Sequence, residues 1–353
     1  MASEQIPKTV KQWNVEKFGG FNGLTFSEQP LPELSDNEVL VKLEAASLNY
    51  RDLIIARGEY PHGKREGVVP GSDGVGTVVA IGKRVSRFQP GDKVVTMFNQ
   101  GHIGGDLNPQ IHRTGTGGML DGVLRTYGAF NEHALVRAPS TLTARESSTL
   151  SCAALTAWNA LYGSLDHVVK AGQWVLVQGT GGVSIFALQF AKAAGARVIA
   201  TTGSPSKVAT LKKLGADHVI SYKEDRRWGE TARKLTGGRG VDIIVQVAGV
   251  NEMEQSIEAI KMCGVITIIG FLAGRTGENE MGFQRCLAKM FTARPVFVGS
   301  RVQMEEMVEA IEAHPDGLRP VIDERVFKLE ELKEAYEYQW TGKHFSKVVV
   351  EID

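Results

Sequence analysis

A short apolar run that leads directly into closely spaced glycines constrains the fold of this chain more than any other feature. Residues 175–177 are typical of a buried strand, and three glycines follow within residues 179–182. An apolar stripe over residues 186–191 predicts a helix that ends at Gly195, and residues 197–201 form a second predicted strand. Strand, glycine-rich turn, helix and strand make one βαβ unit of the kind that binds dinucleotides.

Each small residue of this turn has a predicted part in holding a pyrophosphate. Gly179 allows the tight turn, Gly181 lets the backbone approach the phosphates, and Gly182 with the small Ser184 lets the helix pack close to the strand. The positive N-terminal end of the helix then faces the phosphates. We expect the following residues to contact the cofactor here: Gly179, Thr180, Gly181, Gly182 and Val183.

The end of the second predicted strand indicates which dinucleotide is bound. Sites specific for NAD carry an Asp or Glu about 20 residues after the first glycine, but none occurs between Gly179 and Ala216. Hydroxyls, a glycine backbone and a lysine suit the extra 2′-phosphate of NADPH instead. An ordinary polar loop before a helix is the alternative interpretation. The sequence favours NADP over NAD, with these expected contacts: Thr202, Gly203, Ser204 and Lys207.

Length and composition limit the class of protein. A chain of 353 residues is expected to form two domains. The formal net charge is zero and no basic run stands out, so neither nucleic acid nor a membrane surface is an expected partner. Three widely spaced cysteines do not form a disulfide framework and suit a reducing compartment. With no signal-type segment at the N-terminus, we expect a cytoplasmic protein with a small-molecule substrate.

The pattern of the chain changes twice, which predicts an α/β protein. Up to about residue 150 it indicates mostly β structure, with a long glycine-rich segment at 99–126 that is expected to be functional or mobile. From there to about residue 300, strands alternate with helices, which implies a doubly wound parallel sheet whose sixth strand is residues 296–298. Two helices and a final strand follow.

Over nearly its full length, the chain resembles the medium-chain dehydrogenase/reductase superfamily, and is most similar to its zinc-independent, alcohol-dehydrogenase-like and quinone-oxidoreductase-like branch. The resemblance is carried by seven segments in the expected order: residues 47–52 (SLNYRD), 70–76 (PGSDGVG), 90–94 (PGDKV), 155–158 (LTAW), 178–184 (QGTGGVS), 214–220 (LGADHVI) and 344–349 (HFSKVV).

The resemblance implies three parts and an active site in the cleft between the domains. Residues 1–149 would form a GroES-like β domain, residues 150–312 the Rossmann cofactor-binding domain, and residues 313–353 a return to the first domain. It also implies that no zinc is bound. Asn49 and Ser72 stand where zinc-dependent members carry ligands, only Cys152 fits, and residues 92–125 contain no cysteine for a structural zinc.

Loss of zinc removes the Lewis acid that would polarise an alcohol or carbonyl oxygen. Reduction of an enone, enoyl group or quinone spreads the negative charge, so hydrogen-bond donors suffice, whereas alcohol oxidation would need a general base. By alignment of the motif, the expected catalytic residues are Asn49, Tyr50 and Arg51, with Arg51 nearest the substrate oxygen. A structural ion pair between Arg51 and Asp52 is the alternative.

Further cofactor contacts come from the resemblance alone. Thr156 would lie beside the nicotinamide and Tyr222 near the adenosine. Phe271 and Leu272 would pass the carboxamide, and Lys347 would close the cleft.

Together these observations predict an NADPH-dependent, zinc-independent reductase of an activated double bond or carbonyl. A zinc-free alcohol dehydrogenase or carbonyl reductase is one alternative, and an NADPH-binding protein with a structural or sensory role is another. The apolar residues 296–298, at a sheet edge without a charge to protect it, also predict a homodimer.

Overall fold

The computed structural model describes residues 6–270 and 282–353 and divides into two compact units. Unit 1 contains Met1–Ala153, Ser300–Pro315 and Arg319–Asp353, and unit 2 contains Ala154–Gly299 and Asp316–Leu318. Within the described residues the helices are too short or too polar to cross a lipid bilayer.

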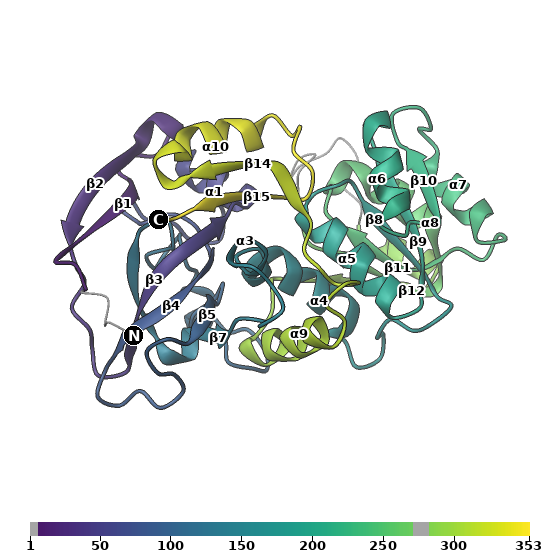
Figure 1. Ribbon diagram of the computed structural model, residues 1–353. Helices are drawn as coiled ribbons and strands as arrows, with labels where there is room; N and C mark the ends of the chain where they lie inside the picture. The colour runs from purple at the N-terminus through teal and green to yellow at the C-terminus, as the bar shows by residue number, and fades with distance from the viewer. Residues whose placement is uncertain (1–5, 271–281) are drawn as a thin grey trace. The chain divides into compact units, whose positions relative to one another are not determined.

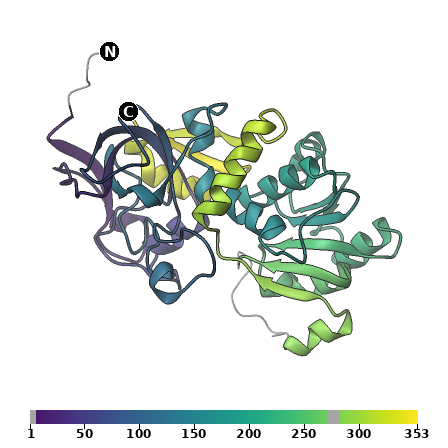
Figure 2. The ribbon, with the colours of Figure 1, turned by 90° about the horizontal axis from the view of Figure 1, so that it is seen from below.

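Unit 1 is built on a mostly antiparallel sheet that the two ends of the chain share, in which the pair β14 and β15 is parallel. Its strands run in the order β14-β15-β3-β4-β5-β7, and β6 pairs with β3. The C-terminal strands β14 and β15, yellow in Figure 1 and Figure 2, lie beside the purple and blue strands of this unit. The strands of unit 1, with the separate pair β1 and β2, are β1 (Thr9–Val15), β2 (Leu24–Pro30), β3 (Glu38–Ser47), β4 (Asp73–Ile81), β5 (Lys93–Thr96), β6 (Tyr127–Asn131), β7 (Leu135–Arg137), β14 (Ile322–Lys328) and β15 (Lys347–Glu351).

Short helices cover this sheet and complete its core. Phe130, Tyr336 and Val350 belong to one buried apolar cluster, so segments far apart in sequence share a single core. Burying side chains of this size is worth about 1.5–3 kcal/mol each. The Trp13 indole donates a 2.7 Å hydrogen bond to the Leu329 carbonyl, which ties the N-terminal strand to the C-terminal segment. The helices are α1 (Tyr50–Ala56), α2 (Pro109–His112), α3 (Ala144–Ser147), α9 (Arg301–Ala313) and α10 (Leu332–Trp340).

Unit 2 is a parallel sheet in the strand order β10-β9-β8-β11-β12-β13. In chain order this is 3-2-1-4-5-6, the doubly wound arrangement of dinucleotide-binding sheets. Its central strands are buried along their whole length, because helices cover both faces. The strands are β8 (Trp174–Gln178), β9 (Arg197–Thr202), β10 (His218–Ser221), β11 (Val241–Gln246), β12 (Ile260–Ile268) and β13 (Thr292–Pro295). The helices are α4 (Leu155–Tyr162), α5 (Gly182–Ala193), α6 (Val208–Lys213), α7 (Trp228–Leu235) and α8 (Met253–Ala259). Outside these helices, a π-helical turn spans Leu150–Ala154, and short 3-10 turns lie at Phe21–Gly23, Glu132–Ala134, Pro205–Lys207, Val250–Glu252, Phe283–Ala288 and Leu329–Glu331.

The predicted position of the sixth strand is wrong. The edge strand is β13, Thr292–Pro295, and the apolar residues 296–298 follow it. Val298 has a φ of 52°, which takes the backbone out of the extended conformation. Arg294 holds β13 in place, because its guanidinium donates to the Asn159 carbonyl at 2.8 Å and to the Asn159 side-chain oxygen at 2.6 Å.

Helix α9 also differs from its predicted place, since sequence analysis included it in the Rossmann segment and it packs within unit 1. Its Glu305 accepts a 2.7 Å hydrogen bond from Arg87, and its Glu312 accepts one from the Ser140 backbone at 2.8 Å. The glycine-rich segment 99–126 is packed rather than loose around Thr116, which is fully buried.

Candidate functional site

The glycine-rich turn of unit 2 leaves open space beside its backbone where a side chain would stand. Gly179 follows β8 with a φ of +76°, a conformation that favours glycine, and Gly181 is the N-cap of α5. A Cβ atom on Gly179 or Gly181 would meet nothing within 4 Å. The Ser184 hydroxyl donates to the Gln178 carbonyl at 2.6 Å and so fixes the helix to the strand. A helix start without acidic residues in its first turn is suited to bind an anion.

This turn lies where the strand order of the sheet reverses. Strand β8 has β9 on one side and β11 on the other, and ligands of such sheets bind at the carboxyl ends of the strands at this point. Gln178, the last residue of β8, connects this strand to the segment that follows β11. Its side chain donates to the Ser256 hydroxyl at 3.0 Å and accepts from the Ala248 backbone at 3.3 Å.

Residues predicted to bind the adenosine end of the cofactor come together beside the turn. The Lys207 ammonium donates to the Thr180 hydroxyl at 3.2 Å, and the Ser204 backbone donates to the Thr202 hydroxyl at 3.1 Å. A Cβ atom on Gly203 would lie 2.5 Å from the Tyr222 hydroxyl, so only glycine allows this approach.

Lys223 was missed by sequence analysis. Its Cε would lie 3.0 Å from a Cβ atom on Gly203. The sequence could have indicated it, because Lys223 directly follows Tyr222, which was predicted to bind the cofactor. Two lysines, Lys207 and Lys223, therefore lie near the end of β9. This charge distribution suits a phosphate monoester.

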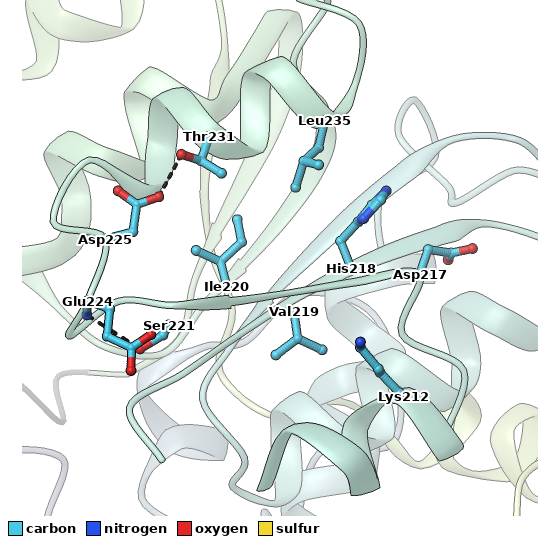
Figure 3. A pocket seen from close by; sticks show the side chains of 10 residues that line it. All are labelled: Lys212, Asp217, His218, Val219, Ile220, Ser221, Glu224, Asp225, Thr231 and Leu235. Atoms are coloured by element: carbon cyan, nitrogen blue, oxygen red, sulfur yellow. Dashed lines mark hydrogen bonds between the residues drawn. The ribbon is translucent and has the colours of Figure 1, made fainter. Parts of the chain in front are cut away.

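A separate pocket of about 380 Å³ lies along the edge strand β10 (Figure 3). Its lining contains three carboxylates, Asp217, Glu224 and Asp225, and Asp225 accepts a 2.6 Å hydrogen bond from the Thr231 hydroxyl. None of the residues predicted to bind the cofactor lines it. Carboxylates repel phosphate, so we do not expect the cofactor phosphates to bind in this pocket.

In unit 1, the predicted catalytic residues lie where β3 leads into α1. Asn49 is the N-cap of α1, and its backbone N–H donates to the Asp52 carboxylate at 2.8 Å. This bond satisfies one of the free donors of the helix start and fixes the turn. Asn49 is 9% exposed and Asp52 is fully buried.

Lys347, predicted to contact the cofactor, is instead surrounded by acceptors of its own unit. The side chain is 2% exposed. Its ammonium donates to the Leu48 carbonyl at 2.8 Å, to Asn49 Oδ1 at 2.5 Å and to Asp73 Oδ2 at 3.1 Å. These three bonds match the three N–H donors of an ammonium group.

Arg51 forms the ion pair that sequence analysis gave as the alternative to a catalytic role. Its Nη1 lies 3.3 Å from Asp52 Oδ1 and donates to the Thr116 carbonyl at 2.8 Å. The guanidinium carbon lies 4.5 Å from the centre of the Phe98 ring and 5.0 Å from that of Tyr60. Arg51 is 7% exposed. Its bond to the Thr116 carbonyl anchors the glycine-rich segment to α1.

Burial changes the acidity of two groups in this region. It raises the pKa of the Asp52 carboxyl to about 6, although Arg51 opposes the change. It also raises the pKa of the Cys152 thiol well above its usual range, and the negative charge of Asp73 adds to the effect. The Cys152 residue as a whole is partly exposed. A thiol in this environment is a poor nucleophile and a poor metal ligand.

The remaining predicted site residues are more scattered. The Tyr50 ring stacks on Trp340 of α10, with ring centres 6.0 Å apart, and burial raises the pKa of its hydroxyl. Thr156 is buried in α4 of unit 2. Phe271 and Leu272 lie outside the described residues.

The positions that the resemblance assigns to zinc ligands do not fit a zinc ion. They carry an amide, a hydroxyl and a thiol (Asn49, Ser72 and Cys152), whereas zinc sites use thiolate, imidazole or carboxylate. The Asn49 amide nitrogen lies 3.3 Å from the Ser72 hydroxyl, and the Lys347 ammonium already bonds the amide oxygen. Among residues 6–270 and 282–353, no group of three or more His, Cys, Asp or Glu side chains is placed to hold a metal.

Comparisons with known proteins identify the family of both parts of the chain. Residues 35–143 match the family model described as an alcohol dehydrogenase GroES-like domain, and residues 182–313 match that of a zinc-binding dehydrogenase. A zinc-type alcohol dehydrogenase-like protein of Schizosaccharomyces pombe is 45% identical, over 96% of this chain and 98% of the relative. A quinone oxidoreductase of Lama guanicoe is 27% identical over 94% and 93%. The solved structure of an NAD-dependent alcohol dehydrogenase superposes with a TM-score of 0.86 at 30% identity, over 97% of this chain and 100% of that chain.

Proposed function

Because the chain belongs to the medium-chain dehydrogenase/reductase superfamily and is an oxidoreductase of that type, we propose that it is an NADPH-dependent, zinc-independent reductase of enones, enoyl groups or quinones. One observation carries the proposal. The Lys347 ammonium bonds Asn49 and Asp73 directly, at the place where the resemblance puts a catalytic metal. A second cation there would be repelled.

The nucleotide would be held by the residues of unit 2 that the structure brings together. The turn at 179–183 would hold the pyrophosphate, and Lys207 with Ser204 would hold the 2′-phosphate. When bound, NADPH supplies the hydride. One similar solved structure is that of an NAD-dependent enzyme, so the preference for NADPH over NADH rests on Lys207 and Ser204.

Stabilisation of the negative charge falls to the side chains of unit 1. Asn49 Nδ2 has two N–H donors, of which one faces Ser72. The second is available for a substrate oxygen. Arg51 uses Nη1 for both Asp52 and the Thr116 carbonyl, and this ion pair favours a structural role for it, so we assign the donor role to Asn49. A single fixed donor is adequate where the charge is delocalised over an enolate or hydroquinone.

The proposal is tested by measuring NADPH and NADH oxidation against a panel of quinones, enones and simple aldehydes. We expect turnover with NADPH and the conjugated substrates. Turnover confined to alcohols or plain aldehydes would favour a zinc-free alcohol dehydrogenase, and tight NADPH binding without turnover would favour a binding protein.

Lys207→Ala is expected to weaken NADPH binding and to leave NADH binding almost unchanged, because it removes a charge-assisted contact worth about 1.5–3 kcal/mol. Fluorescence titration with both cofactors measures the effect, and Lys213→Ala, an exposed lysine of α6, is the matched control. Equal losses for both cofactors would show that Lys207 does not contact the 2′-phosphate.

Activity is expected to survive prolonged treatment with a strong chelator, and metal analysis of the purified protein should give much less than one zinc per chain. The reason is that the three positions assigned to zinc carry Asn49, Ser72 and Cys152. One tightly held zinc per chain, lost together with activity, would contradict zinc independence.

A homodimer paired along the edge strand β13 also remains a proposal. The edge differs from the apolar one expected from sequence, because it consists of Thr292–Pro295 and ends in a proline that cannot donate a backbone hydrogen bond. Light scattering at micromolar concentration should give twice the mass of the chain. A monomer would remove the proposal.

A further inference from the structure

The Asn49 amide is held in one of its two possible orientations. Its Oδ1 accepts from the Lys347 ammonium at 2.5 Å, and its Nδ2 lies 3.3 Å from the Ser72 hydroxyl. A rotation of the amide by half a turn would bring its NH2 group against the ammonium, donor against donor. Lys347 therefore decides that the donor end of Asn49 points away from it.

The register of three neighbouring strands places Lys347 for this task. Strand β3 lies between β15 and β4, and Ser47 at its end pairs with Val349 on one side and with Asp73 on the other. The Leu48 backbone donates to the Val348 carbonyl at 2.9 Å, which brings the start of β15 beside Asn49. The geometry is built into the sheet and needs no ligand.

Asp73 holds the ammonium from the opposite side. This fully buried carboxylate accepts from Lys347 at 3.1 Å and from the Ser47 hydroxyl at 2.9 Å. A buried ammonium is costly unless it is paired and hydrogen-bonded, and Asp73 supplies the paired carboxylate.

We propose that Lys347, anchored by Asp73, is a positioning residue that holds the Asn49 amide with its NH2 group available to the substrate oxygen. The proposal rests on the donor role of Asn49 in the proposed function. It departs from a cofactor contact, since all three N–H groups of Lys347 are bonded within unit 1.

The test uses the paired variant Lys347→Met/Asp73→Asn, because Lys347→Met alone would strand a buried carboxylate. Lys343→Met, an exposed lysine before the same strand, is the control and should behave as wild type. In the paired variant kcat should fall on the order of 10- to 100-fold, as when a reacting group is misplaced by about 1 Å. The Kd of NADPH should be unchanged.

A double-mutant cycle shows whether the effect passes through Asn49. In an Asn49→Ala background, the paired variant should cause no further loss of kcat. An equal loss in that background would overturn the proposal. So would a weakened NADPH affinity with unchanged kcat, which would make Lys347 a cofactor ligand.

A second readout is independent of activity. The side-chain NH2 signals of Asn49, identified in an NMR spectrum by their absence in Asn49→Asp, should shift in the paired variant and stay in place in Lys343→Met. If wild-type protein reduces none of the substrates, the proposed function fails, but this spectrum still reports the orientation of the amide. Unchanged signals in the paired variant would refute the positioning role.

Discussion

Arg51→Leu is expected to lower the free energy of unfolding by about 3–5 kcal/mol, the usual cost of breaking a buried ion pair by removing one partner. The substitution leaves the Asp52 carboxylate fully buried without its cation and removes the bond to the Thr116 carbonyl. Chemical denaturation monitored by circular dichroism measures the loss.

The pH dependence of this loss follows from the raised pKa of Asp52. The folded-state pKa, about 6, exceeds the unfolded value near 3.9, so the ionised carboxyl costs stability as pH rises through this window. Below about pH 5 the carboxyl is protonated in the folded variant, and the effect of Arg51→Leu should be smaller there than at pH 8.

Arg51→Leu/Asp52→Asn separates stability from catalysis. It removes both charges, so much of the lost stability should return. If Arg51 is structural, turnover of this variant should recover as well. A folded double variant that has lost turnover at least ~10²-fold would instead place the guanidinium at the substrate oxygen.

Asn49→Ala is expected to lower kcat about 10²- to 10³-fold, by analogy with the loss of one oxyanion-hole donor. The affinity for NADPH should stay the same, because the proposed nucleotide site lies in unit 2. Stopped-flow measurement of NADPH oxidation under single-turnover conditions isolates the effect on the chemical step.

Asn49→Asp is the matched variant of the same size. Its carboxylate can still accept from Lys347 and cap α1, but it has no N–H to donate. We expect it to be as slow as Asn49→Ala. Near-normal turnover of Asn49→Asp would show that the amide donor is not used.

The fold of unit 2 was predictable because the sequence patterns that indicate it are local. A buried strand, three glycines and an amphipathic helix follow one another at residues 174–191, and the structure forms β8, the turn and α5 there. The parallel sheet also follows from strands alternating with helices. The spacing of apolar residues and the positions of glycines depend on residues that are close in the chain, so a single sequence is enough to recognise them.

The edge of the same sheet was not predictable in this way. The apolar residues 296–298 resemble a strand better than Thr292–Pro295 does. What selects the latter is Arg294, whose partner Asn159 lies 135 residues earlier in the chain. Such a tertiary contact has no local signature, and it overrides strand propensity.

The contacts among the candidate catalytic residues of unit 1 were not predictable for the same reason. Sequence analysis identified Asn49, Tyr50, Arg51 and Lys347 but could not pair them. The acceptors of Lys347 are 274 and 298 residues away in the chain, at Asp73 and Asn49. Only the strand order β15-β3-β4 brings these groups together.

The central proposal, hydride delivery to carbon of an activated double bond without a metal, is tested most directly with NADPH carrying deuterium at the transferred position. Chelator-treated protein is given this cofactor and an acyclic enone, and the product is examined by mass spectrometry and NMR. We predict a saturated ketone with deuterium at the β-carbon. Deuterium on the carbinol carbon of an allylic alcohol, or transfer that appears only when zinc is restored, would contradict the proposal.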